Sequence, residues 1–445
     1  MSLKTNIYLC LSIVIPCLLL TSCSPYLHKL DLDSLENKST QIHEVIKKDY
    51  PFTDHKKIDW GLFSSGISQL SNKNNIHKQD YLKMREIVYK LPDARINLVS
   101  KKDKSLQEEE TGGYIGFDIA NTPQGNYFIS RIDSSSKAWE VGMRPGYQII
   151  GWNQKLISDI IESFPLRWGF HPATDEIRHL LACHYLSRGK EGSSAEVFYV
   201  NSKENNKGVR LTFEREKQIN YPFTIGIISH QDKKKNGFQL FSDSLAYLRI
   251  DQFTPSSLRY FNNKVLSALN EITGLIIDLR ENTGGYDPIA VKIAGHFATQ
   301  SRTYEEAFIK EGDDIRIINT LISQPEAPQV LTNIIILTGP LTMGVAEGFA
   351  KLLQKEDHVR LLGSWSTAGS FSLPGGQLKL GDGIRLTYPI GGSMDENHKI
   401  IIEAGERAQG IRPDIFIPLN KKMIIQMANG VDVLLAEAIN HIWIN

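Results

Sequence analysis

The sequence predicts a multidomain protein of mixed α/β and β class, with an N-terminal helical region, a β-rich module and an α/β core around a mainly parallel sheet. Three observations predict this. A chain of 445 residues is too long for one compact core. Helical spacing of apolar residues gives way to short strands, and strands then alternate with helices. The boundaries we expect are 1–22 for a leader, 23–105, 106–217 and 218–445.

The composition is that of a globular protein without a strong electrostatic preference. Lys and Arg total 50, as do Asp and Glu, so no net charge favours nucleic acid as a partner. The chain has no H-E-x-x-H, no paired C-x-x-C and no phosphate-binding loop. We therefore expect no metal, no cofactor and no nucleic acid.

The first residues have the pattern of an export signal. Lys4 precedes an apolar run over 7–20, which is too short for a comfortable membrane span. The run ends in Leu20-Thr21-Ser22-Cys23, which resembles a bacterial lipobox. The resemblance implies removal of 1–22, acylation of Cys23, and a lipoprotein anchored to a membrane and facing the periplasm or the cell exterior. The alternative is an ordinary signal peptide followed by a chance cysteine.

Cysteine usage argues against a disulfide in the mature chain. Loss of the leader leaves Cys23 and Cys183, and Cys23 would carry the lipid. Cys183 lies within an apolar-periodic stretch, which favours a buried structural thiol over a nucleophile.

The region 23–105 is expected to be helical. Trp60, Phe63, Ile67 and Leu70 recur at three- and four-residue spacings, the pattern of an amphipathic helix. Pro92 then marks the end of the helical pattern.

The region 106–217 is expected to be rich in strands. A glycine-led loop runs into the first strand, and a short helix near 135–139, a G-x-x-x-G turn and another strand follow. A longer helix is expected near 174–187. The order resembles that of PDZ modules.

That resemblance implies a site for peptides or protein C-termini. PDZ modules add the peptide as a strand and hold its carboxylate on backbone N–H groups of the glycine loop. The matching residues here are Gly113, Tyr114, Ile115, Gly116 and Phe117. A β-sandwich without a binding role is the alternative.

The region 218–445 is expected to be the α/β core. Strands are expected at 246–250, 274–280 and 333–338, each followed by a helical pattern. Such alternation indicates a mainly parallel sheet with helices on both faces.

One motif in this core is specific enough to indicate a family. Asp278-Leu279-Arg280-Glu281-Asn282-Thr283-Gly284-Gly285 resembles the D-L-R-x-N-x-G-G signature of the C-terminal-processing, or tail-specific, serine peptidases, which have a crotonase-like core. Further pieces follow in the order typical of the family. They are Asp59-Trp60, the PDZ-like module, the strand at 333–338, Thr367-Ala368-Gly369 and Gly410-Ile411-Arg412-Pro413-Asp414-Ile415.

The resemblance also assigns the catalytic positions. Gly284 and Gly285 would supply one N–H of an oxyanion hole, and Val345 would supply the second. The family's nucleophile lies in a T-x-S-x-x-E pattern, where this sequence has Thr342-Met343-Gly344-Val345-Ala346-Glu347. Gly344 has no side chain to attack with.

The base is also replaced. One branch of the family has a lysine about 25 residues after the serine, and no lysine lies near Gly369 and Ser370. Another branch has a histidine in an L-x-D-x-H pattern, and Arg95 takes that position. Arginine stays protonated and cannot act as a general base. Glu403 or Glu406 remains as a candidate third member.

Other side chains could in principle replace the lost groups. The candidate hydroxyls are those of Thr342, Ser366, Ser370 and Ser372, and the candidate bases are His179, His184 and His296.

Three functions follow from these alternatives. The leading hypothesis is a pseudopeptidase that binds peptides or protein C-termini. The second is an active serine endopeptidase that processes exported proteins. The third is a carrier of a small apolar ligand, which would need an apolar cavity.

Overall fold

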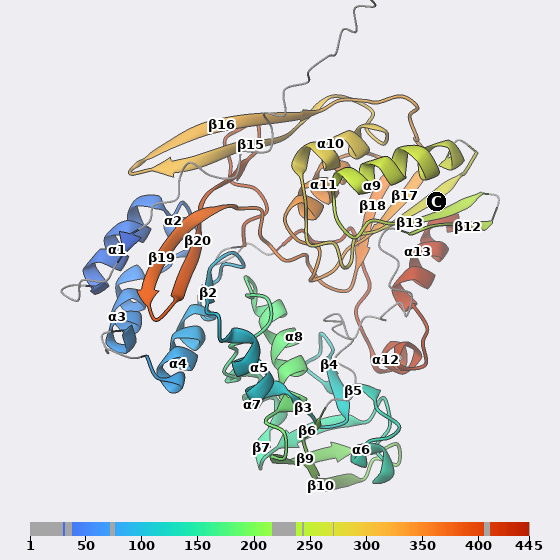
Figure 1. Cartoon of the computed structure of the whole chain (residues 1–445). Coiled ribbons are helices and arrows are strands. Elements are labelled where there is room, and N and C mark those ends of the chain that lie inside the picture. The colour runs from blue at the N-terminus through green and yellow to red at the C-terminus, as the bar shows by residue number, and fades with distance from the viewer. Residues whose placement is uncertain are drawn as a thin grey trace, which may run out of the picture.

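The computed structural model describes residues 30–31, 38–71, 76–215, 237–242, 244–269, 271–404 and 410–444. The leader, the lipobox Cys23 and Glu406 lie outside them. Within the described ranges, no helix is both long enough and apolar enough to cross a membrane. Figure 1 shows an α/β sheet at one side, a long hairpin across the top, N-terminal helices opposite the sheet and a β module below. This architecture confirms the predicted multidomain mix of α/β and β structure.

The α/β sheet is mainly parallel, as expected. Its order is β12-β13-β14-β17-β18-β21, and every neighbouring pair is parallel except β12 with β13. Every residue of β14 is buried, as in a strand covered on both faces. The strands are β12 (Gly237–Ser242), β13 (Leu245–Arg249), β14 (Gly274–Asp278), β17 (Asn333–Leu337), β18 (Val359–Gly363) and β21 (Ile415–Phe416).

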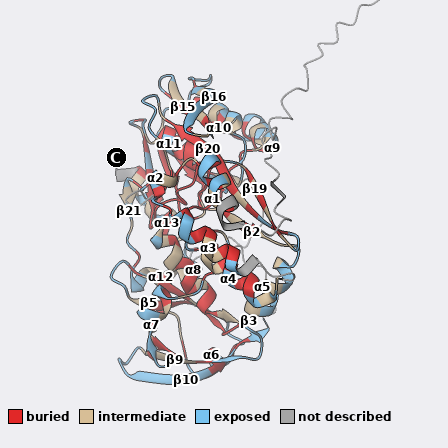
Figure 2. Cartoon of the chain, turned by 90° about the vertical axis from the view of Figure 1, so that its left-hand side faces the viewer, coloured by how far each residue is buried: buried red, intermediate tan, exposed pale blue. Residues whose placement is uncertain are grey.

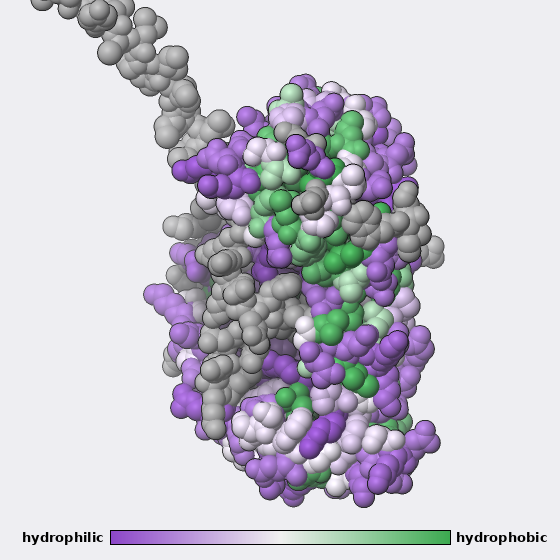
Figure 3. All heavy atoms as spheres, turned by 90° about the vertical axis from the view of Figure 1, so that its right-hand side faces the viewer, coloured by the Kyte–Doolittle hydropathy of each residue, from purple (hydrophilic) through white to green (hydrophobic). Residues whose placement is uncertain are grey.

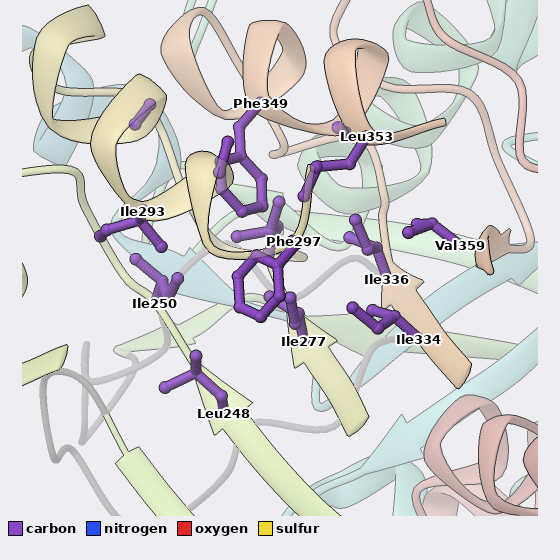
Figure 4. Packing of buried hydrophobic residues seen from close by; sticks show 14 of the residues in the cluster. Leu248, Ile250, Ile277, Ile293, Phe297, Ile334, Ile336, Phe349, Leu353 and Val359 are labelled. Carbon is purple, nitrogen blue, oxygen red and sulfur yellow. The ribbon is translucent and has the colours of Figure 1, made fainter. Parts of the chain in front are cut away.

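Helices cover both faces of this sheet. On one face lie α9 (Pro255–Tyr260), α10 (Asp287–Gly295) and α11 (Val345–Leu353), with the short turns η1 (Phe261–Val265) and η2 (Leu266–Leu269) after α9. Figure 4 shows Phe297 and Phe349 packed between these helices and the strand residues Ile277 and Ile336. On the other face, α13 (Val433–Ile444) packs through Leu434 and Ala438. Burial of each large side chain contributes about 1.5–3 kcal/mol, so this core fixes the ends of β14 and β17 firmly.

A second sheet was not expected from the sequence. It is mostly antiparallel, in the order β1-β19-β20-β15-β16, with β2 added to β20. Its strands are β1 (Leu30–Asp31), β2 (Asn97–Val99), β15 (Arg302–Glu311), β16 (Asp314–Ser323), β19 (Leu373–Gly381) and β20 (Ile384–Met394). The C-terminal region therefore contributes long antiparallel strands as well as the α/β sheet.

The N-terminal helices share their core with this second sheet. Trp60, Phe63 and Ile67 are buried, as their spacing predicts, and they belong to one cluster with Leu378 and Leu386 of β19 and β20. The helices thus reach a core only by packing on strands from the far end of the chain. They are α1 (Lys38–Asp49), α2 (Thr53–Lys56), α3 (Trp60–Ser71) and α4 (Lys78–Val88).

The β module forms the lower end of the molecule (Figure 1). Its main sheet has the order β10-β9-β6-β5-β4, which leaves β4 at an edge beside α8, and β11-β3-β8 form a small second sheet. The elements are α5 (Asp103–Thr111), β3 (Gly113–Tyr114), β4 (Phe117–Asn121), β5 (Tyr127–Ile132), α6 (Lys137–Glu140), β6 (Gln148–Trp152), β7 (Lys155–Leu156), α7 (Ile157–Glu162), α8 (Asp175–Leu186), β8 (Arg188–Gly189), β9 (Ser194–Val200), β10 (Asn206–Thr212) and β11 (Glu214–Arg215).

The module contacts the α/β core through a C-terminal helix. In α12 (Lys421–Ala428), Ile424 packs with Ala120 of β4 and Phe128 of β5. Figure 2 shows the buried residues concentrated in the strands and inner helix faces, with β10 exposed at the lower tip. Figure 3 shows that one face is mostly hydrophilic, with its largest apolar grouping in the upper half.

Candidate active-site cleft

Position 344 lies on a tight turn between β17 and α11. Thr342 fixes the approach to this turn, because its hydroxyl donates to the Leu279 carbonyl at 2.8 Å and accepts from the Gly339 N–H at 3.0 Å. Gly344 itself has φ 60° and ψ −122°. Side chains rarely adopt this positive φ, so a residue other than glycine here would carry backbone strain.

Glu347 holds the turn from the helix side. Its carboxylate accepts from the N–H groups of Gly344, Gly369 and Ser370 at 3.0, 2.7 and 3.1 Å, and from the Thr367 hydroxyl at 2.5 Å. Burial raises the pKa of Glu347 to about 8, and the four donated hydrogen bonds oppose that rise. All three amides can only donate, so the arrangement fits the ionised carboxylate. The glutamate therefore stabilises the turn and has no free oxygen for proton transfer.

Arg95 fills the space in which a side chain at position 344 would lie. A Cβ at Gly344 would lie only 2.6 Å from Nη2 of Arg95. The Arg95 Nε is shielded from solvent and has no hydrogen-bond partner in the described part of the chain. The two positions that the resemblance assigns to the base and the nucleophile are therefore adjacent in space.

The glycine-rich loop after β14 is kept close to the start of α11. Asn282 joins the two, because its carbonyl accepts from the Met343 N–H at 3.0 Å and its side chain accepts from the Gly284 N–H at 2.9 Å. A Cβ at Gly284 would lie 3.5 Å from the Val345 nitrogen. Gly285 has φ 143°, and a Cβ there would lie 2.2 Å from the Phe253 carbonyl oxygen. Only glycine fits this position.

Two backbone N–H groups in this cleft have no partner. The amides of Gly285 and Val345 donate to no group within the described residues, whereas Gly284 is bonded to Asn282. Val345 is the first residue of α11, where N–H groups are free and the helix dipole is positive. The pair predicted for an oxyanion hole is therefore brought together, with Gly285 as the member whose N–H is free.

Behind Arg95 lies a buried charge cluster that the sequence does not predict. Nζ of Lys56 donates to Oδ2 of Asp93 at 2.8 Å and to Oε2 of Glu403 at 2.7 Å, and the three side chains are fully buried. The Tyr50 hydroxyl donates to Asp93 at 2.5 Å, and the Phe371 N–H donates to Glu403 at 2.6 Å. Glu403 is therefore bound to a lysine and a backbone amide.

One lysine cannot neutralise both carboxylates of this cluster. Burial raises the pKa of Glu403 to about 7, and Lys56 opposes that shift while the charge of Asp93 adds to it. Burial also disfavours the ionised form of Asp93, but Lys56 and the donated hydrogen bonds outweigh it and lower the pKa of Asp93. The negative charge thus resides mainly on Asp93, the residue that also accepts the Arg95 N–H at 2.8 Å.

The rest of the glycine-loop motif anchors the C-terminal helix. Arg280 is buried and forms paired hydrogen bonds with Asp278 and with Asp432, with closest contacts of 2.7 Å to each. Bidentate pairing of a guanidinium with a carboxylate fixes the relative orientation of the two side chains and also compensates their charges. The Asp-Leu-Arg part of the motif is therefore structural.

Comparison with known proteins places this cleft in a family. Residues 244–417, which include the glycine loop, the 344 turn and Glu403, match peptidase family S41. Residues 244–417 form a peptidase S41 domain. A carboxy-terminal processing protease, CtpB of Bacillus subtilis, is 24% identical over 339 residues, which is 75% of this chain and 59% of that protein. This chain thus matches somewhat more than half of its relative's length.

Solved structures share the fold over nearly the whole S41 chain. Mature CPAF, in complex with lactacystin, has a TM-score of 0.63 at 13% identity and covers 91% of this chain and 98% of its own. A putative peptidase from Parabacteroides merdae has a TM-score of 0.51 at 15% identity, covering 92% and 97%. At these identities the likeness concerns the fold.

The four hydroxyls that could in principle replace a nucleophile at position 344 differ in their hydrogen bonds. Thr342 is occupied by two backbone hydrogen bonds, and Ser366 donates to Glu176 at 2.7 Å. The hydroxyls of Ser370 and Ser372 are buried without a partner in the described residues, so neither is hydrogen-bonded to a base there. None of the four has the nucleophile–base contact that activates a hydroxyl.

The alternative bases and the free thiol are structural side chains. His296 ends α10 and its Nδ1 lies 3.0 Å from the Pro328 carbonyl. His184 lies on α8 beside Arg188, where burial lowers its pKa to about 3. His179 lies on the same helix of the β module. Cys183 is buried, which raises its pKa to about 12, so its thiol stays protonated as expected for a structural cysteine.

The loop that was predicted to bind a peptide carboxylate is partly hydrogen-bonded within the β module itself. Gly113 and Tyr114 form β3, which pairs with β8 and β11, and the Ile115 N–H donates to the Ser187 carbonyl at 3.0 Å. The Gly116 amide donates to no described group, and its φ of 100° requires glycine. Phe117 then begins the edge strand β4. The free donor of this loop is therefore Gly116.

Proposed function

We propose that this S41 homologue is a pseudopeptidase that binds peptide segments or protein C-termini without cleaving them. The observation that carries the proposal is the contact between positions 95 and 344. Nη2 of Arg95 lies 2.6 Å from where the Cβ of a nucleophile would be, so position 344 has no nucleophile and the guanidinium would have to move to admit one. Nucleophilic catalysis needs a hydroxyl beside a base, and both are replaced.

The binding parts of the cleft favour the same proposal. The free N–H groups of Gly285 and Val345 can still donate to a carbonyl or a carboxylate. Loss of side-chain chemistry beside intact backbone donors is expected of a protein that holds a peptide but does not attack it.

The β module would supply a second contact with the peptide. We propose that it is a PDZ-type domain, in which the peptide adds to the free edge of β4 beside α8. The unpaired Gly116 amide would receive the peptide carboxylate.

The proposed location is an exported lipoprotein. The support is the lipobox-like sequence ending at Cys23, which would tether the chain to a membrane by acylation. Labelling of cells with a radioactive fatty acid would test this, and a Cys23→Ala chain should remain unlabelled.

A pocket of about 310 Å³ between α1 and β15 is a candidate site for an apolar ligand, since Ile309 and Ile390 contribute to its lining. The pocket is partly open, and Lys48, Asp49 and Lys310 also line it, so it does not enclose a ligand as a carrier's cavity would.

Binding without cleavage can be measured with the full chain in detergent. A fluorescein-labelled unfolded protein should show saturable anisotropy, and mass spectrometry should recover it intact after prolonged incubation. Absence of binding to any unfolded protein would contradict the proposal, and new fragments would contradict its pseudopeptidase part.

A further inference from the structure

Arg95 forms no ion pair among the residues that the structure describes. The Nε of its side chain is shielded from solvent. Among the residues described, its backbone amide donates to Asp93, and no further hydrogen bond of Arg95 is formed. A guanidinium offers five N–H donors, so a partly buried one without an acceptor points to a missing ligand.

The acidic groups around Arg95 are already occupied. Asp93 and Glu403 share Lys56, and all four contacts of Glu347 are with donors of its own turn. Asp287 interacts with Arg95 electrostatically, but its carboxylate accepts from the Tyr304 hydroxyl at 2.9 Å. The guanidinium is thus left free to receive an acceptor from outside the chain.

Other unsatisfied donors lie around the same turn. The N–H of Val345 is at the N-terminus of a nine-residue helix, and the N–H of Gly285, in the glycine loop beside that terminus, donates to no described group. Ser370, whose carbonyl accepts from Gly344, is fully buried and its hydroxyl has no described partner. Together with Arg95, these donors come from four separate segments of the chain, so no single helix end accounts for them.

We infer that the former catalytic centre is a carboxylate-binding site. The Arg95 guanidinium would pair with the two oxygens of the carboxylate, while the amides of Gly285 and Val345 donate to the same group. A planar fork of donors suits a carboxylate better than a single carbonyl oxygen. This inference rests on the proposed function, and adds that the residue lost from catalysis has become the residue that recognises the ligand.

The carboxylate can come from two places on a peptide. It can be the free C-terminal group or the side chain of an internal Asp or Glu. Three labelled decapeptides separate these sources, all built from Ala, Ser and Val. The first has a free carboxyl end, the second has an amidated end, and the third has an amidated end and one internal Glu.

The experiment measures the affinity of the full chain in detergent for each peptide. We expect at least one carboxylate peptide to bind about tenfold or more tightly than the neutral amide, because a charge-assisted pair is lost in the amide. Arg95→Met should weaken this preference and should remove it for the peptide with an internal Glu, because the Gly116 loop is proposed to hold only a free C-terminus. Arg95→Lys, which keeps the charge but loses the bidentate geometry, should keep part of it. Arg210→Met, at an exposed position on β10, is the matched control and should keep all of it.

The outcomes separate the inference from the proposed function. Equal binding of all three peptides would overturn the carboxylate site while peptide binding stands. The same holds if Arg95→Met leaves the carboxylate preference unchanged in a chain with unchanged melting temperature. If no peptide binds to the natural chain, both fail.

Discussion

The backbone groups and the side chains of the cleft form two halves that differ in what they offer a ligand. The backbone half, formed by Gly284, Gly285 and the start of α11, keeps the geometry of an oxyanion hole and has free donors. The side-chain half has Gly344 and Arg95 at the positions where the sequence resemblance expects a nucleophile and a base. The difference teaches that backbone donors can be held by turns and glycines alone, whereas the chemistry proposed for the cleft depends on two side-chain positions.

The side-chain half also differs in how its charge is held. Glu347 is satisfied by backbone donors and one hydroxyl, so its position does not depend on another charged residue. Glu403 and Asp93 depend on Lys56, which they share. Removal of that single lysine should therefore affect the molecule more than any change in the backbone half.

The largest effect is expected for Lys56→Met. The change leaves two carboxylates buried without their cation, and breaking a buried ion pair in this way costs about 3–5 kcal/mol. Urea unfolding would measure the loss, with the exposed Lys101→Met as a control expected to change little. A loss below about 1 kcal/mol would show that the cluster does not bear on stability.

A smaller effect is expected for Gly344→Ala. The new Cβ would meet Nη2 of Arg95 at 2.6 Å on a backbone of φ 60°, so we expect a loss of about 2–4 kcal/mol. In an Arg95→Ala chain the same change should cost less by about 1 kcal/mol or more.

Gly125→Ala is the matched control for the strain alone. Gly125 has φ 76° and no neighbour near a new Cβ, so the change adds strain without a clash. If Gly344→Ala costs the same in both backgrounds, Arg95 does not occupy the space of the lost side chain.

Thr342→Val should cost about 2 kcal/mol. It removes one buried hydroxyl that satisfies both the Leu279 carbonyl and the Gly339 amide. Thermal unfolding would detect the loss. A drop in any peptide-cleaving activity without a loss of stability would instead identify Thr342 as a relocated nucleophile.

The smallest effect is a pH dependence that reports on Glu403. Its folded pKa of about 7 is above its ordinary value of 4.5, so its contribution to stability is present below pH 4.5 and is lost as pH rises through 7. Asp93 acts oppositely, since its lowered pKa gives a contribution that is present above 3.8 and lost in acid.

Glu403→Gln should remove the first of these trends. The fall in the free energy of unfolding between pH 5 and pH 8 should shrink by roughly 2 kcal/mol, because glutamine does not ionise. The exposed Glu44→Gln serves as a control. An unchanged slope in Glu403→Gln would mean that Lys56 keeps Glu403 ionised throughout.

The sequence predicts the backbone half of the cleft better than the side-chain half. The glycine-loop motif and the strand–turn–helix at 344 are local patterns, so spacing alone locates Gly284, Gly285 and Val345. The contact between Lys56 and Glu403 joins residues 347 positions apart, and no local pattern predicts it. The steric relation between Arg95 and Gly344 is likewise a product of the fold.

The second sheet was missed for a related reason. In β16, Ile315, Ile317 and Ile318 are all exposed, at 51%, 41% and 43%, so the strand lacks the alternation that predicts a half-buried strand. The N-terminal helices were predicted from their periodicity, but their partner strands come from the other end of the chain. Asp93 and Asn282 lie in motifs that can be recognised in the sequence, but the groups they contact are known only from the structure.

The measurement that tests the central claim most directly is cleavage of an unfolded protein by the purified full chain, followed by mass spectrometry. The natural chain and the Gly344→Ser, Arg95→His double variant would be compared, with Gly344→Ser alone as the control in which Arg95 still blocks the site. We predict no fragments from the natural chain or the single variant, and any gained activity only in the double variant. Fragments produced by the natural chain, and abolished by a substitution elsewhere in its cleft, would contradict the account.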